Sequence, residues 1–272
     1  MNTDPTIAAS GSPHSANAKN ASEAGEDRPV VPKIIHQFWD RPDPPSDVAE
    51  RMQSWRELHP GWAYIQWSDE STESFIGARF GAQAARSFRA CVLPTMRADM
   101  LRVAAIWVFG GVYADADVLA LQPVEPLLDH PATFVTRTLP GKPFVLHLDM
   151  MISRPSSALL RAAWKRLLAN ITKSGGKPLE RIRKGELNHP AHLTGPHNFT
   201  RAWEALPDAD RKHIRLISRD EASRYIEPSR FLSYVKTQGT WKEFKKKHRV
   251  VDFDRADRIA AERAGTIDAL GE

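Results

Sequence analysis

Apolar residues recur along the chain in two alternating patterns, which predict strands and helices in turn. VVPKIIHQFWD at residues 30–40 is a short apolar run bounded by prolines, and it predicts a buried first strand. Residues 47–58 predict a helix, in which Asp47 and Glu50 have the spacing of a capping box. The apolar positions of this helix are Val48, Met52, Trp55 and Leu58. WAYIQWSD at residues 62–69 alternates as a strand does, so the chain has the rhythm of an α/β protein.

A second helix is predicted over residues 94–109, with a proline in its first turn and Gly110 as the residue that ends it. The segment PTMRADMLRVAAIWVF is largely apolar, which predicts a buried helix. Asp99 and Arg102 lie three positions apart and share a face, whereas Arg97 points elsewhere. Charges on a buried helix require partners, so the pair serves either as a structural ion pair or as part of a ligand site.

Two aspartates follow this helix directly. After the paired glycines, residues 112–114 predict a brief strand that delivers Asp115 and Asp117 to its carboxyl end, where open α/β sheets place their ligands. Residues i and i+2 of an extended chain point the same way, about 6–7 Å apart. Such carboxylates repel unless a cation neutralises them, and Mg²⁺ or Mn²⁺ carrying a diphosphate is the fitting partner. A turn or a helix cap is the alternative interpretation of the same pair.

Composition predicts one domain with an amino-terminal arm. Residues 1–29 mix small and polar side chains without periodicity, so we expect them to be disordered, and we expect residues 30–272 to form a single domain. The arm lacks the pattern of a secretory signal, and no window approaches the roughly 18 apolar residues of a membrane-spanning helix. These features favour a soluble protein. Cys91 is the sole cysteine, which excludes an internal disulfide and a cysteine-rich zinc site and fits a reducing compartment.

The formal net charge is +5, and part of the excess lies in WKEFKKKHR at residues 241–249. Such a run serves either as a solvated helix face or as a contact with an anionic membrane surface. No aromatic residues are interleaved with it in a stacking pattern, so we expect no nucleic-acid partner.

Three segments resemble glycosyltransferase family 32, the DXD-containing sugar-transfer enzymes related to yeast-type α-mannosyltransferases and to the catalytic domains of clostridial glucosylating toxins. They are PKIIHQFW, RADMLRVAAIWVFGGVYADADV and HLTGPHNFTRAW, which stand in that order along the chain. The resemblance covers about residues 31–206, and the middle segment is its most specific part.

The resemblance implies a GT-A fold, that is, a Rossmann-like mixed sheet flanked by helices. The nucleotide-binding half would occupy about residues 30–125 and the acceptor-side half about residues 126–250. It further implies transfer of a hexose from a nucleotide-diphosphate sugar to a glycan or glycolipid acceptor, with retention of configuration and with Mn²⁺ or Mg²⁺ as cofactor. Surface-polysaccharide or glycolipid assembly in the cytoplasm, peripherally at the inner face of the membrane, is the context that such a relative would suit.

The resemblance also assigns roles to individual residues. Trp39 would stack on the donor base. Asp99 and Arg102 match the D-x-x-R pair that hydrogen-bonds the donor sugar and the diphosphate. Asp115 would reach the ribose or a metal-bound water, and Asp117 would bind the metal directly, so both belong to the predicted metal site.

Other parts of the resemblance are less complete. Asp149 falls where relatives carry an Asn or Asp close to the transferred sugar. LTGPHNF at residues 193–199 resembles a loop that frames the active site, although a Gly-Pro turn before a helix capped by His197 or Asn198 also accounts for it. Many relatives carry a His-His element near the carboxyl end. The corresponding stretch here, YVKTQGTW, has no histidine, and Lys236 would supply the positive charge instead.

Two alternatives stay open. D-x-D-x-[TV] also begins haloacid-dehalogenase-like phosphotransferases, in which Asp115 would be the nucleophile and the acids of VVDFDRAD, residues 250–257, would act with it. The missing histidines also fit a sugar-nucleotide-binding module without catalysis.

Overall fold

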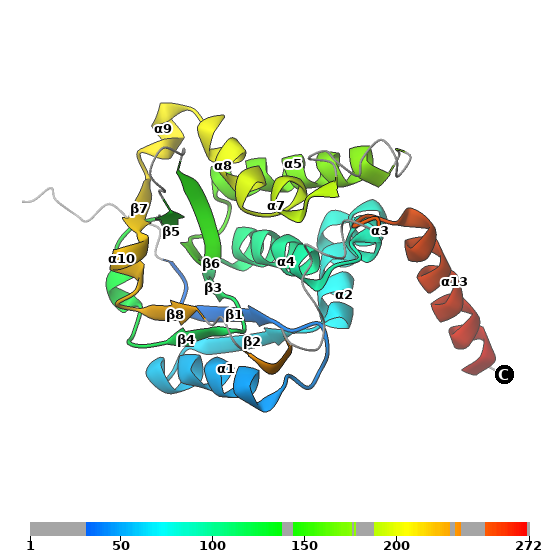
Figure 1. Ribbon diagram of the computed structural model, residues 1–272, viewed down its shortest axis with the longest axis horizontal. Helices are drawn as coiled ribbons and strands as arrows, with labels where there is room; N and C mark the ends of the chain where they lie inside the picture. Colours follow the sequence, from blue (N-terminus) through cyan, green and yellow to red (C-terminus); the bar gives the residue numbers. More distant parts are fainter. Residues whose placement is uncertain are drawn as a thin grey trace, which may run out of the picture.

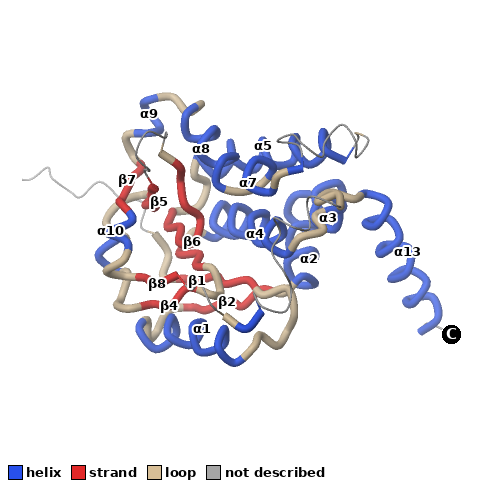
Figure 2. Tube along the Cα trace, in the orientation of Figure 1, coloured by secondary structure: helices blue, strands red, loops and turns tan. Residues whose placement is uncertain are grey.

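A mixed six-stranded sheet forms the centre of the protein (Figures 1 and 2). The computed structural model describes residues 31–137, 144–175, 177, 188–228, 232–234 and 248–270, with side chains up to residue 264. The strand order is β2-β1-β3-β6-β5-β7, and a separate two-stranded sheet pairs β4 with β8. The strands are β1 Ile34–Phe38, β2 Ala63–Trp67, β3 Gly111–Ala114, β4 Val118–Ala120, β5 Ala132–Arg137, β6 Val145–Ser153, β7 Ile214–Ser218 and β8 Ile226–Pro228.

Strand directions divide the large sheet into two parts. β1 is parallel to both β2 and β3, β6 is antiparallel to its neighbours β3 and β5, and β5 is parallel to β7. The expectation of a mixed sheet flanked by helices is therefore confirmed. The carboxyl ends of β1 and β3 lie side by side, which brings the residues after them to one edge of the sheet.

Helices cover both faces of the sheet (Figure 1). α1 lies on one face, and α4 lies on the other beneath α5, α7 and α8. The helices are α1 Ser46–Leu58, α2 Asp69–Phe80, α3 Ala82–Ala90, α4 Pro94–Phe109, α5 Ala158–Gly175, α7 Pro190–Leu193, α8 Pro196–Glu204, α9 Asp208–Arg211, α10 Arg219–Ala222 and α13 Phe253–Leu270, with a 3₁₀ turn at Glu125–Leu127. None of these described helices combines the length and the apolar content needed to cross a bilayer.

The helix predicted over residues 94–109 is confirmed, and every residue from Met96 to Ile106 is buried. Its side chains fill the space between the sheet and α5, so its charged residues are enclosed with the apolar ones. Gly110 ends the helix with φ 68°, in the left-handed region that the sequence assigns to it.

Gly111 begins β3 under a different constraint. Its φ is +98°, and a Cβ atom placed on it would lie 2.4 Å from the carbonyl oxygen of Ile34. Only glycine lets the backbones of β1 and β3 approach so closely. The glycine pair thus ends the buried helix and sets the strand that leads to Asp115 against the middle of the sheet.

His36 locks this turn in place. The His36 ring donates from Nε2 to the carbonyl oxygen of Gly110 at 3.0 Å and accepts at Nδ1 from the indole of Trp67 at 3.2 Å. Burial lowers the pKa of His36 to about 4, against which its bond to Gly110 acts only weakly, so the ring is neutral at pH 7. A structural interpretation of His36 accords with these contacts.

The capping box predicted at Asp47 and Glu50 is wrong. α1 begins after Pro45 without a side-chain cap. The Asp47 carboxylate instead accepts hydrogen bonds from the backbone N and the hydroxyl of Ser233, at 2.7 and 2.9 Å. Asp47 therefore accepts two hydrogen bonds from a segment that is distant in sequence and does not cap the start of α1.

Several sequence predictions fall on other parts of the chain. The predicted arm at residues 1–29, most of the basic run at residues 241–249 and Lys236 lie outside the described residues. The division of residues 30–272 into a nucleotide-binding half and an acceptor-side half stays a prediction.

Candidate active site

Two adjoining cavities lie at the carboxyl ends of β1 and β3. The first, about 620 Å³ with its open mouth, is lined by Trp39, Asp117 and Tyr234, among others. The second, about 660 Å³, is lined by Asp99 and Asp149 together with the starts of α7 and α8. Both cavities are lined by Thr95, Arg102 and Asp115. The predicted site residues Trp39, Asp99, Arg102, Asp115, Asp117 and Asp149 therefore all line one or both of these cavities.

The backbone around the two aspartates is tightly held. The N–H of Asp115 donates to the carbonyl oxygen of Asp149 on β6 at 2.9 Å, and the N–H of Val118 donates to the carbonyl oxygen of Asp115 at 3.0 Å. The indole of Trp55 on α1 donates to the carbonyl oxygen of Val118 at 2.9 Å. These bonds fix a turn between β3 and β4, and the turn presents both carboxylates to the first cavity.

Arg102 is the charged centre where the cavities meet. Only 5% of its side chain is exposed, and its Nη2 lies 2.8 Å from Oδ1 of Asp115 and 3.5 Å from Oδ1 of Asp99. Its Nη1 donates to the carbonyl oxygen of Leu148, and its guanidinium lies over the ring of Tyr113. The expected pairing of Asp99 with Arg102 is present, but the shorter contact joins Arg102 to the DXD aspartate.

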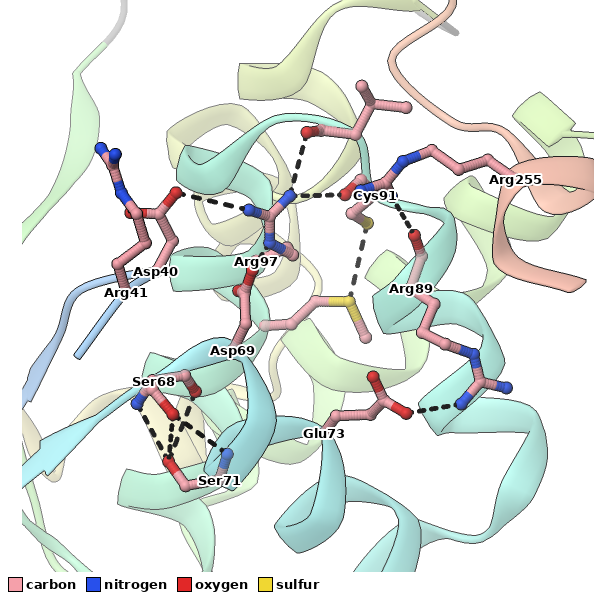
Figure 3. Close-up of polar contacts among 12 residues, drawn as sticks. Asp40, Arg41, Ser68, Asp69, Ser71, Glu73, Arg89, Cys91, Arg97 and Arg255 are labelled. Atoms are coloured by element: carbon pink, nitrogen blue, oxygen red, sulfur yellow. Dashed lines mark hydrogen bonds and ion pairs between the residues drawn. The ribbon is translucent and has the colours of Figure 1, made fainter. Parts of the chain in front are cut away.

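Arg97 has a different set of partners from Arg102, and Figure 3 shows its contacts with Asp69, Asp40 and the backbone of Cys91. Its Nε donates to Asp69 at 2.7 Å, and its Nη2 lies 3.8 Å from Asp40. Its Nη1 donates to the carbonyl oxygens of Cys91 and Val92. Since Asp40 also lines the first cavity, Arg97 supports one rim of the cavity from outside.

The LTGPHNF segment holds Asp99 in place. The hydroxyl of Thr194 donates to Oδ2 of Asp99 at 2.7 Å, and a Cβ atom on Gly195 would lie 3.1 Å from the same oxygen. The pKa of Asp99 is raised by burial, which the attraction of Arg102 and the bond from Thr194 partly offset. This segment therefore frames the site, as the resemblance implies.

The cap predicted for the helix in this segment is wrong. α8 begins after Gly195 without a side-chain cap. Asn198 is buried inside the helix, where its amide donates to the carbonyl oxygen of Ala163 and its side-chain oxygen accepts from Asn170. The Asn198 side chain therefore makes its hydrogen bonds to α5 and not to the first turn of α8.

The two DXD carboxylates share an electrostatic conflict. The pKa of Asp115 is raised to about 7, chiefly by burial and secondarily by the charges of Asp117 and Asp149, while the attraction of Arg102 opposes the rise. This occurs although 29% of the Asp115 side chain still faces the cavity. Burial also raises the pKa of Asp117, and a hydrogen bond from Tyr234 opposes that rise. A bound cation would relieve this repulsion.

Asp149 lines the second cavity and has one carboxylate oxygen without a hydrogen-bond partner among the described residues. Its Oδ2 accepts from Arg219 on α10 and lies 3.8 Å from Nδ1 of His147, whereas its buried Oδ1 has no hydrogen-bond partner among the described residues. Burial acts to raise the pKa of Asp149, but the contacts with His147 and Arg219 outweigh it and lower the pKa. Asp149 is thus held as an anion with an unused acceptor.

Trp39 also lines the first cavity. Its side chain is buried, and its Nε1–H has no hydrogen-bond partner among the described residues. The Trp39 ring meets the ring of Tyr234 edge to face, with 5.3 Å between their centroids. An aromatic face at a cavity wall is suited to a planar base, which is the role that the resemblance assigns to Trp39.

Sequence reasoning missed four polar residues of the site, which are Tyr113, Thr194, Arg219 and Tyr234. Tyr113 had a detectable signal, because a phenol on a buried strand needs a partner, and its hydroxyl donates to Asp115 at 3.0 Å. Thr194 lies in a segment that the sequence singles out. Arg219 has no local signal, whereas Tyr234 begins the YVKTQGTW stretch that the resemblance singles out; their partners lie 70 and 117 positions away in sequence.

The described residues contain no group of three or more His, Cys, Asp or Glu side chains that could hold a metal ion. Asp115 and Asp117 nevertheless fit Mg²⁺ or Mn²⁺, which take one or two carboxylates and complete their shells with water and phosphate oxygens. Burial raises the pKa of both residues, and a bound cation would favour their charged forms.

The acids required by the phosphotransferase alternative are not brought to this site. Among the described residues of VVDFDRAD, none lines either cavity. Asp257 forms an ion pair with Arg86 at 2.7 Å, and α13 packs against α3. The described acids of this segment therefore do not act together with Asp115.

Comparison with known proteins places these residues in context. Residues 45–134 match the family described as "Glycosyltransferase sugar-binding region containing DXD motif". Inositol phosphoceramide mannosyltransferase 2 of Schizosaccharomyces pombe is 32% identical over 199 residues, which is 71% of this chain and 54% of that protein. Mannosyl phosphorylinositol ceramide synthase CSH1 of Saccharomyces cerevisiae is 35% identical over 111 residues, which is 41% of this chain and 29% of that protein. The matched part of the chain thus spans about half the length of the fission-yeast relative. It spans less than a third of the length of the budding-yeast relative.

Among solved structures, the PaToxG glycosyltransferase has a TM-score of 0.49 with 14% sequence identity, covering 68% of this chain and 74% of that one.

Proposed function

We propose, from the premise that residues 45–134 belong to the DXD-containing glycosyltransferases, that this protein is a GT-A glycosyltransferase. It transfers a hexose from a nucleotide-diphosphate sugar to a glycan or glycolipid acceptor. The observation that carries the proposal is the junction of two cavities at Arg102 and Asp115, with the DXD pair and Trp39 in one and Asp149 in the other.

The first cavity is assigned to the nucleotide. Trp39 stacks on the base, and the carboxylates of Asp115 and Asp117 would hold Mn²⁺ or Mg²⁺ at the other end of the cavity. When bound, the cation neutralises charge on the diphosphate. Asp115 also carries the hydrogen bonds from Tyr113 and Arg102, which keep its carboxylate in one orientation.

Arg102 supplies fixed positive charge between the cavities. Because its guanidinium is already oriented by Asp115 and Leu148, it needs no rearrangement to stabilise the charge that grows on the departing diphosphate. Its burial strengthens that interaction relative to water.

The second cavity is assigned to the transferred sugar and the acceptor. Asp99, held by Thr194, and Asp149 both line this cavity and would accept hydrogen bonds from sugar hydroxyl groups. Transfer with retention follows if the acceptor oxygen attacks the anomeric carbon from the side of the leaving group. The bond from that carbon to the phosphate oxygen breaks, and the phosphate oxygen takes the acceptor proton.

Substrate and location are parts of the same proposal. The similarity to the yeast mannosyltransferases favours a mannosyl donor and an inositol phosphoceramide-like glycolipid acceptor. A glycolipid acceptor fits a cytoplasmic enzyme bound peripherally at the inner face of the membrane, with the basic run at residues 241–249 as the contact to anionic lipid.

The test is a thermal-shift screen of nucleotide sugars with and without Mn²⁺, because a ligand of the folded state raises the melting temperature. We expect at least one Mn²⁺-dependent shift, which Asp117→Asn abolishes. Asp129→Asn is the matched control, since Asp129 is exposed and contacts Arg215 rather than either cavity. Shifts that persist in Asp117→Asn without Mn²⁺ would contradict the site.

Assays of turnover then distinguish the three hypotheses, which are a glycosyltransferase, a binding module without catalysis and a phosphotransferase. Release of the sugar, or its transfer to a lipid or glycan acceptor, supports a glycosyltransferase. Binding without turnover supports the binding module. Hydrolysis of a phosphomonoester that Asp115→Asn abolishes supports the phosphotransferase.

A further inference from the structure

We infer that Tyr234 is a positioning residue that joins the two ends of the nucleotide site: its hydroxyl orients the Asp117 carboxylate for the cation, and its ring holds Trp39 for the base. The inference rests on the proposed function. It adds a residue from the stretch in which the expected histidines are missing.

One side chain makes both contacts. The hydroxyl of Tyr234 donates to Oδ2 of Asp117 at 2.7 Å, which is the length of a good hydrogen bond to a carboxylate. The ring of Tyr234 meets the ring of Trp39 edge to face at 5.3 Å. Asp117, Trp39 and Tyr234 all line the first cavity. The Tyr234 side chain therefore contacts both Asp117, which would bind the cation, and Trp39, which would stack on the base.

The backbone beside Tyr234 is anchored outside the cavity. Ser233 donates twice to the Asp47 carboxylate, and Leu232 is 7% exposed in a cluster with Trp39 and Met52. These contacts tie the segment at residues 232–234 to α1. They explain why the Asp47 side chain does not form the helix cap that its position in the sequence predicts.

A cation does not displace this hydrogen bond. Each carboxylate oxygen has two lone pairs, so Asp117 can accept from Tyr234 and still offer positions to a metal ion. Partners that orient a ligating side chain typically change metal affinity about 10–100-fold when they are removed. Loss of the Tyr234 hydroxyl should therefore weaken cation binding without removing a ligand.

Tyr234→Phe and Tyr234→Ala separate the two contacts. Phenylalanine keeps the ring against Trp39 and loses the bond to Asp117, whereas alanine loses both. Mn²⁺ binding is measured from the spectrum of free Mn²⁺ by electron paramagnetic resonance. Binding of UDP and of GDP is measured in EDTA from tryptophan fluorescence. Tyr225→Phe is the matched control, because Tyr225 packs in a different apolar cluster and lines neither cavity.

We expect Tyr234→Phe to bind Mn²⁺ about tenfold more weakly than the wild type, with its affinity for the nucleoside diphosphates unchanged. Tyr234→Ala should lose affinity for both probes. Asp47→Asn, which loosens the anchor from outside the cavity, should weaken Mn²⁺ binding in the same direction and less strongly. It keeps the inference testable if the substitutions at Tyr234 unfold the protein.

Equal Mn²⁺ affinity in Tyr234→Phe and the wild type would overturn the inference and leave the proposed function intact. A wild-type protein that binds no Mn²⁺, with or without UDP or GDP, would overturn both. A loss of Mn²⁺ affinity in Tyr225→Phe as large as that in Tyr234→Phe would also sink the inference, since the effect would then not belong to the site.

Discussion

The hydroxyl of Thr194 donates to the carboxylate of Asp99 at 2.7 Å and joins two residues that are 95 positions apart in sequence. Both side chains are buried. The fixed geometry of Asp99 in the second cavity therefore depends on a residue of the LTGPHNF segment.

Thr194→Val tests this dependence. Valine preserves the shape and leaves a buried carboxylate oxygen without its donor, which should lower the free energy of unfolding by about 1–3 kcal/mol. Thr194→Ser keeps the hydroxyl and should lose much less. Urea denaturation of both variants measures the difference. Equal stability of the two variants would show that the hydrogen bond contributes nothing.

Arg102→Met should lower the free energy of unfolding by about 3–5 kcal/mol, because it leaves the carboxylates of Asp99 and Asp115 buried without a compensating charge. Adding Asp115→Asn to this variant removes one of those charges and should restore part of the loss. Denaturation of the two single variants and the double variant forms a cycle that measures the coupling. Additive losses would mean that the two residues do not interact.

His36 should make stability depend on pH. The pKa of His36 is lowered to about 4 in the folded protein, whereas the unfolded chain takes up the proton near pH 6.5. The unfolded state thus binds more protons between these values, so stability is complete above about pH 6.5 and falls as the pH drops toward 4.

The limiting slope for His36 is about 1.4 kcal/mol per pH unit. Between pH 7.5 and 5.5 the wild type should lose about 1.4 kcal/mol more than His36→Gln, because the limiting slope is approached only below pH 6.5. Urea unfolding of the wild type and the variant at pH 7.5 and 5.5 measures it. A parallel decline in both proteins would assign the pH dependence to other groups.

Gly111→Ala should be far more damaging than Gly81→Ala. Both glycines have positive φ, at 98° and 88°, so both substitutions carry the strain of that conformation. Only at Gly111 would the new Cβ meet backbone, 2.4 Å from the oxygen of Ile34, whereas nothing lies within 4 Å at Gly81. We expect Gly81→Ala to fold with a lower melting temperature and Gly111→Ala to be largely unfolded by circular dichroism. Similar melting temperatures would show that β1 and β3 can separate without loss of the fold.

Local features of the site were predictable from the sequence. The bounds of α4 and the left-handed Gly110 follow from an apolar segment between a proline and a glycine pair. The placement of Asp115 and Asp117 at a strand end follows from the brief apolar run before them. These features depend on interactions within a few residues, which periodicity and glycine positions reveal.

Long-range features were not predictable in the same way. Asp47 has the spacing of a cap but binds Ser233, because tertiary donors compete with local ones once the chain is folded. Arg219 and Tyr234 approach Asp149 and Asp117 only through the packing of later elements onto the sheet. No periodicity or motif spacing near either residue predicts these two hydrogen bonds.

The pairing of β4 with β8 has a consequence for how this protein is made. β4 begins directly after Asp117, and its partner β8, at Ile226–Pro228, is synthesised much later. During translation the two acidic residues leave the ribosome long before the strand that secures them. Contacts between such distant segments form slowly, because closing the intervening chain costs entropy. The first cavity should therefore be among the last parts of the nascent protein to form.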